Sequence, residues 1–104
     1  MGETIDYEGD FANVPVELID EVTKLIENFA DDADIGISEP EDDMVYITFS
    51  LPNGWRGGGA SCEEILNRDF KSWMDAHPDI ELNVYCYYVE LPPYDVVTYN
   101  KHKD

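Results

Sequence analysis

Basic residues are scarce in this sequence of 104 residues. Only six residues are Lys or Arg, against 24 Asp and Glu, so the formal net charge is −18. A surface this negative is repelled by DNA, by RNA and by the anionic face of a membrane, so direct binding to any of them is disfavoured. Cationic partners are favoured instead.

Cysteines and long apolar runs are also few. The two cysteines, Cys62 and Cys86, do not make a disulfide framework, which fits a reducing compartment. No apolar run approaches the roughly 20 residues of a membrane-spanning helix, and the first residues lack the basic and apolar regions of a signal peptide. We therefore expect a cytoplasmic protein that does not bind membranes.

Motifs for metal binding are missing as well. The two cysteines and two histidines are too far apart in the sequence for a zinc signature. An EF-hand with Gly36 at its sixth position would place Ala33 and Ile35 at two positions that must supply oxygen ligands. We predict no metal centre.

The glycine-rich segment and the cysteine that follows it are the remaining candidates for chemistry. Residues Gly57–Gly59 resemble, in outline, an anion-binding turn before a helix, but the GK[ST] ending of a P-loop is absent. Cys62 falls in the first turn of an expected helix, where the helix dipole favours the thiolate. A cysteine nucleophile also needs a base, and the sequence places neither His77 nor His102 beside it. We predict no catalytic site and no cofactor, and the roles of the glycine segment and of Cys62 stay open.

Apolar residues are abundant enough for a folded domain. They make up 43% of the sequence, too large a share for a chain kept disordered by its charge. The length fits a single domain, 1–104, with a short N-terminal arm at 1–12 and a frayed tail at 101–104.

Hydrophobic periodicity predicts the secondary structure. Helical spacing predicts one helix over 16–29 and a second over 61–76. Alternation and strand-forming residues predict strands over 33–38, 44–51, 80–91 and 94–100, with an additional strand over 4–7 left open. The predicted fold class is α+β, in the order α-β-β-α-β-β. It has an antiparallel sheet of four to five strands and two helices packed on one face.

The last hairpin is rich in tyrosine. If Leu82, Val84 and Cys86 face the core, then Tyr85 and Tyr87 lie on the opposite face of the sheet. Half-exposed tyrosine serves in interfaces and in strand packing alike, so both roles stay open for this pair.

Acidic residues are concentrated in the first part of the chain. Residues 1–43 hold 15 Asp and Glu against one basic residue, Lys24, whereas residues 44–104 hold nine against five, giving net charges of −14 and −4. A general acidic surface has no reason to be so uneven, whereas a surface that faces a partner does. Acids three or four residues apart on a helix lie about 5–6 Å apart, a spacing similar in scale to that of phosphates along a nucleic-acid strand. The predicted partner-binding residues are Glu17, Asp20, Glu21, Glu27, Asp31, Asp32, Asp34, Glu39, Glu41, Asp42, Asp43, Trp55 and Arg56.

In size and composition the chain is similar to phage-encoded inhibitors of host defence, including several anti-CRISPR and anti-restriction proteins. The similarity covers no motif. It implies an inhibitor, not an enzyme, that mimics nucleic acid and occupies the cationic site of a nucleic-acid-binding protein in the host cytoplasm. One alternative is an acidic immunity or antitoxin-like protein that binds a basic nuclease through a compact patch with Tyr and Trp anchors. Another is a salt-adapted domain of unrelated function. The oligomeric state, monomer or homodimer, stays open.

Overall fold

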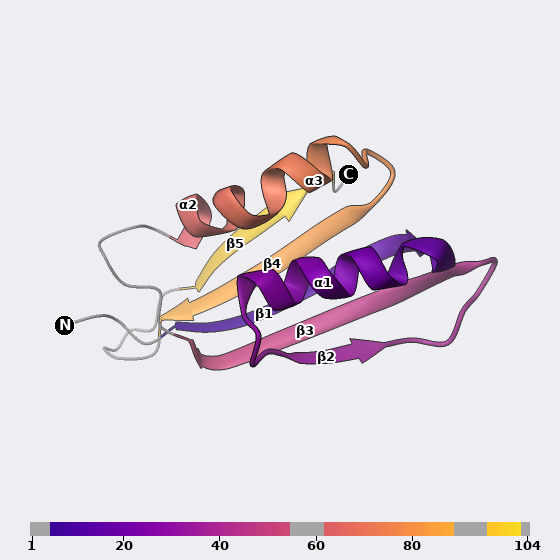
Figure 1. Ribbon diagram of the computed structural model, residues 1–104. Helices are drawn as coiled ribbons and strands as arrows, with labels where there is room; N and C mark the ends of the chain where they lie inside the picture. Colours follow the sequence, from indigo (N-terminus) through magenta and orange to yellow (C-terminus); the bar gives the residue numbers. More distant parts are fainter. Residues whose placement is uncertain (1–4, 55–61, 89–95, 103–104) are drawn as a thin grey trace.

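Five strands form one antiparallel sheet in the spatial order β2-β3-β1-β4-β5 (Figure 1). The computed structural model describes residues 5–54, 62–88 and 96–102. In chain order the elements are β1 (Ile5–Pro15), η1 (Val16–Leu18), α1 (Ile19–Phe29), β2 (Asp34–Ile37), β3 (Met44–Gly54), α2 (Cys62–Leu66), η2 (Asn67–Lys71), α3 (Ser72–Asp75), β4 (Glu81–Tyr88) and β5 (Val96–Lys101).

The start of the chain differs from the predicted order. Most of the segment expected as an arm at 1–12 belongs to β1, the central strand of the sheet, and α1 begins only at Ile19, after the 3-10 turn η1. The predicted order was therefore wrong, because it lacked a complete first strand. The observed order is β-α-β-β-α-β-β.

Two irregularities obscure β1 in the sequence. At Gly9 the strand has no side chain on its core face, because the ring of Phe49 occupies that space, and a Cβ atom built on Gly9 would overlap the ring. A β-bulge between Phe11 and Val14, with Asn13 at a φ of 63°, then shifts the alternation of inward and outward residues. The strand therefore shows only a short stretch of regular alternation.

The other elements follow the predicted pattern. The β2–β3 and β4–β5 hairpins are antiparallel, and the inward residues of β3 are buried. Cys86 is buried in the core, as predicted. The second helix is continuous but contains a π-helical stretch, η2, between α2 and α3. The tail is ordered further than predicted, since β5 includes Lys101 and the Nε2 atom of His102 lies 3.0 Å from the backbone oxygen of Met74.

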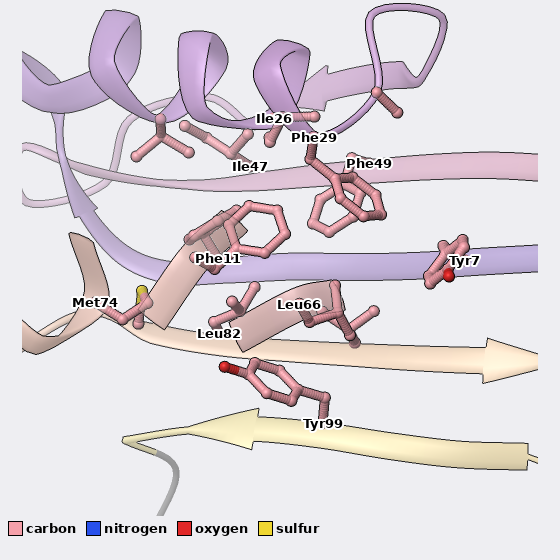
Figure 2. Packing of buried hydrophobic residues seen from close by; sticks show 14 of the residues in the cluster. Tyr7, Phe11, Ile26, Phe29, Ile47, Phe49, Leu66, Met74, Leu82 and Tyr99 are labelled. Atoms are coloured by element: carbon pink, nitrogen blue, oxygen red, sulfur yellow. The ribbon is translucent and has the colours of Figure 1, made fainter. Parts of the chain in front are cut away.

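Both helices pack on the same face of the sheet around a cluster of phenylalanines (Figure 2). The ring of Phe70, in the second helix, lies with its centroid 5.8 Å from Phe11, 5.3 Å from Phe29 and 5.9 Å from Phe49. These four side chains come from β1, α1, β3 and η2, so the cluster joins both helices to the sheet. Each such ring pair adds about 0.5–1.5 kcal/mol beyond the burial of its area. In the described part of the chain, no helix is both long enough and apolar enough to cross a membrane.

Candidate binding surfaces

The predicted acidic residues are all exposed. Eleven of the predicted partner-binding residues are acids, and the structure describes each of them at the surface. None of the eleven lies in an ion pair with another described residue. Ten of them belong to η1, α1 and the connections on either side of β2, and we call these ten the acidic edge: Glu17, Asp20, Glu21, Glu27, Asp31, Asp32, Glu39, Glu41, Asp42 and Asp43.

One end of the acidic edge is the tip of the β2–β3 hairpin. The backbone oxygen of Asp43 accepts a hydrogen bond of 3.0 Å from the backbone N–H of Val16, and Pro15 pairs with Met44. These contacts bring the hairpin tip next to Glu17 at the start of the first helix, as Figure 1 shows at the end of the molecule where β2 and β3 are connected. Acids about 25 residues apart in sequence therefore share one end of the molecule.

The tip closes with a strained two-residue turn. Glu41 and Met44 exchange backbone hydrogen bonds of 2.8 and 3.0 Å, and the two residues between them, Asp42 and Asp43, have φ values of 54° and 63°. Positive φ at both central positions is typical of a type I′ turn, for which Asn-Gly is the favoured sequence. The chain thus holds two aspartates in a left-handed conformation that glycine adopts at no cost.

The other end of the acidic edge lies beyond α1. Glu27, Asp31 and Asp32 stand at or after the last turns of this 11-residue helix, about 16 Å along its axis from its start. Lys24 lies between the two ends and within one helical turn of both Asp20 and Glu27. The acids therefore form two groups separated by a cation, not one continuous row.

Glu21 has a contact that its place in the sequence does not suggest. Its Oε1 atom accepts a hydrogen bond of 3.3 Å from Nε1 of Trp73 in the second helix. The Trp73 ring also packs edge-on against Phe11, with 6.3 Å between the centroids. Glu21 therefore helps to join the two helices, whereas the other nine acids of the edge have no such contact with the second helix among the described hydrogen bonds.

Asp34 does not belong to the acidic edge. It lies in β2 directly opposite Ser50, whereas the neighbouring pair in this register, Ile35 and Phe49, faces the core. Because side chains alternate along a strand, Asp34 lies on the face of the sheet that the helices leave uncovered.

This uncovered face carries functional candidates that were missed in the sequence. Glu8 and Asp10, on the central strand, line a shallow depression together with Asp34, Ser50 and Tyr85. Asp10 accepts a hydrogen bond of 3.3 Å from Nδ2 of Asn83. In the sequence, Asp6, Glu8 and Asp10 alternate with more apolar residues, which is typical of a strand with the acids on one face. The strand considered over 4–7 was too short to include Glu8 and Asp10. We call this surface the open face and define it by Glu8, Asp10, Asp34, Thr48, Ser50, Asn83 and Tyr85.

Cations elsewhere in the described chain are paired. Lys71 donates a 2.9 Å hydrogen bond to Asp75, Lys101 lies 3.7 Å from the same carboxylate, and Arg68 lies 3.3 Å from Asp69. The hydrogen bond from Lys71 is the main cause of a lowered pKa of Asp75. The second helix and β5 thus balance part of their own charge, unlike the acidic edge.

The described residues include only some of the candidates for chemistry. Within these residues, no group of three or more His, Cys, Asp and Glu side chains is placed to hold a metal ion. The ring of His77 stacks on Trp73 at 3.9 Å, and its Nδ1 atom lies 2.8 Å from the backbone oxygen of Trp73. Trp55, Arg56, Gly57–Gly59 and the side chain of Cys62 lie outside the described residues, so the roles predicted for them stay predictions.

Comparisons with known proteins add no relative: the chain matches no family model, and neither the curated proteins nor the solved structures include a significant match.

Proposed function

We propose that this protein is an acidic inhibitor that places the carboxylates of the acidic edge in the phosphate-binding site of a nucleic-acid-binding protein. The observation that carries the proposal is the gathering of ten exposed carboxylates at one edge, none of them in an ion pair with another described residue. Lys24 reduces the field of the carboxylates within one helical turn of it, and the field of the remaining exposed carboxylates steers a cationic surface towards them.

The arrangement of the edge also supports this proposal. Its two ends are separated by about the length of α1, roughly 16 Å, so they suit an extended cationic groove better than a single cationic side chain. A groove that binds a nucleic-acid strand presents Lys and Arg along a comparable length. Binding of this kind weakens steeply as salt rises, because the Debye length falls from about 10 Å at 0.1 M to about 3 Å at 1 M.

The test is affinity capture from a nuclease-treated extract at low salt, with elution by a salt gradient. The proposal predicts retention of a basic nucleic-acid-binding protein that is released both by salt and by added DNA or RNA. Retention that no nucleic acid can compete would contradict mimicry. A domain that retains nothing and folds only in molar salt would support adaptation to salt, and the proposal would be dropped.

Once the complex has been isolated, paired substitutions in this protein identify which part of the acidic edge contacts the partner. Asp31→Asn with Asp32→Asn tests one end of the acidic edge, and Glu39→Gln with Glu41→Gln tests the hairpin tip. Each pair removes two charges without removing a described hydrogen bond of these side chains, so each should weaken binding and reduce its salt dependence while the fold is kept. The matched control is Glu63→Gln with Asp79→Asn, which removes two exposed charges far from the acidic edge in the sequence. If all three pairs act equally, net charge and not the edge determines binding.

A second candidate is an immunity or antitoxin-like protein that binds a basic nuclease outside its nucleic-acid site. Apolar side chains near the hairpin tip favour it: Tyr46 is 57% exposed, Met44 45% and Ile37 49%. Tyr46 and Met44 line a depression together with Glu39 and Asp42, an aromatic anchor amid charge of the kind found at binding hot spots. For this function, Tyr46→Ala should weaken binding more than Glu39→Gln with Glu41→Gln does. For mimicry the order is reversed.

A further inference from the structure

The open face of the sheet is a second acidic surface, opposite to the helices. Both helices bury their apolar side chains against the other face of the sheet. No described element packs on the open face, which leaves Glu8, Asp34 and Tyr85 exposed. The described part of this face carries no Lys or Arg, because Lys101 pairs with Leu82 and therefore lies on the helix-covered face.

The residues of the open face form two rows across the strands. One row runs Asp34, Ser50, Glu8 and Tyr85 over β2, β3, β1 and β4, and the parallel row runs Gly36, Thr48, Asp10 and Asn83. Adjacent strands are about 4.7–4.9 Å apart and successive residues on one face about 7 Å apart, so one long side chain lying on this face can reach more than one of these carboxylates.

The two rows enclose the depression described above. Gly36 contributes to it by having no side chain, since a Cβ atom there would stand 2.8 Å from Oγ1 of Thr48. Asn83 does not line the depression, but its Nδ2 atom donates a 3.3 Å hydrogen bond to Asp10 and so helps to position that carboxylate. The depression is therefore lined by three carboxylates, two hydroxyls and a tyrosine: Glu8, Asp10, Asp34, Thr48, Ser50 and Tyr85.

We infer that the open face binds an arginine-bearing segment of a protein partner. Charge complementarity selects a cationic occupant over a second copy of this chain or a nucleic acid, both of which are anionic. Arginine fits better than lysine, since its planar guanidinium stacks on an aromatic ring while it donates several hydrogen bonds to carboxylates. Tyr85, 38% exposed and directly opposite Glu8, provides such a ring beside such a carboxylate.

This inference does not rest on the proposed function. Glu8, Asp10 and Tyr85 are not part of the acidic edge, so substitutions can remove either surface without the other.

The test is an NMR titration of the 15N-labelled protein with two capped hexapeptides of equal charge, one alternating Arg and Gly and the other alternating Lys and Gly. The inference predicts saturable shifts in the amides of Glu8–Asp10, Thr48–Ser50 and Val84–Tyr85, with tighter binding of the arginine peptide. Shifts confined to the acidic edge, or equal affinity for the two peptides, would overturn it.

Variants of the protein then test which side chains of the open face bind the arginine peptide. Glu8→Gln with Asp10→Asn should raise the Kd of the arginine peptide about fivefold or more, because hydrogen bonds to charged groups are among the strongest. The amide at position 10 keeps an acceptor for Asn83, and the spectrum itself reports whether the fold is retained. Glu63→Gln with Asp79→Asn, which removes the same charge, should change the Kd less than twofold, because both residues are exposed and neither lines the depression. Tyr85→Leu should abolish the preference for arginine, and a preference that survives would show that the ring is not the platform.

Discussion

Replacing Asp42–Asp43 by Asn-Gly should stabilise the protein while removing two charges from the hairpin tip. Both aspartates have positive φ, 54° and 63°, in the two-residue turn between Glu41 and Met44. A left-handed conformation costs a residue with a Cβ atom about 1–2 kcal/mol, less for Asp and Asn, and costs glycine almost nothing. We expect a gain of about 1 kcal/mol in the free energy of unfolding, or a rise of about 4–8 °C in Tm for a domain of this size.

Relief of charge repulsion would also stabilise this variant, so the control must separate charge from strain. Glu39→Gln with Glu41→Gln removes the same charge from the tip and leaves the turn residues unchanged. In 1 M salt, where screening suppresses the charge effect, this control should have the stability of the wild type. Asn-Gly at 42–43 should remain about 1 kcal/mol more stable under the same conditions. If chemical denaturation in 1 M salt finds no difference between this variant and the wild type, the turn is not strained and the reasoning is wrong.

Three further predictions test other parts of the molecule. Gly9→Ala should lower the free energy of unfolding by about 1–3 kcal/mol in chemical denaturation, because the added Cβ atom would overlap a buried ring. Gly36→Ala, on the edge strand, should cost less than about 1 kcal/mol, because its Cβ atom meets only a hydroxyl that can rotate away. Burial raises the pKa of Tyr99 to about 12 from 10.0, so the stability it contributes is complete below pH 10 and is lost as the pH rises to 12. In Tyr99→Phe, the free energy of unfolding should no longer fall between pH 10 and 12 because of this tyrosine. At neutral pH the same variant should be about 0.5–1.5 kcal/mol less stable, because it loses the 2.7 Å hydrogen bond to Asn67. Lys24→Gln should tighten partner binding several-fold at low salt if the acidic edge is the contact, and weaker binding would place Lys24 itself in the interface.

Most of the fold was predictable because local periodicity and tertiary burial agree. The apolar residues of α1 recur at helical spacing and pack on the core, and β3 alternates cleanly over Val45, Ile47 and Phe49. The exception is β1, where the packing of Phe49 over Gly9 removes the side chain that alternation requires. Phe49 lies about 40 residues after Gly9 in the chain, so no local sequence pattern shows that position 9 must lack a side chain.

The candidate surfaces were predictable only in part, for a similar reason. The excess of acids before residue 44 predicted an exposed acidic surface, and the eleven acids predicted to bind a partner are indeed exposed. The division into two surfaces depends on sheet register, which places Asp34 opposite Ser50 and Glu8 opposite Tyr85. The bond between Glu21 and Trp73 joins two helices that are separate in sequence, so helical spacing could not predict it.

The position of the charges favours recognition over solubility as the reason for them. A requirement for solubility is met by a carboxylate at any exposed site, and Asn28, Thr98 and Asn100 are exposed positions in regular structure that carry no charge. The chain instead keeps aspartate at both strained positions of the hairpin tip, where Asn-Gly would be more stable. Strain of this kind is retained in proteins chiefly at functional sites. For the proposed function, replacing these two aspartates should therefore stabilise the protein and weaken partner binding.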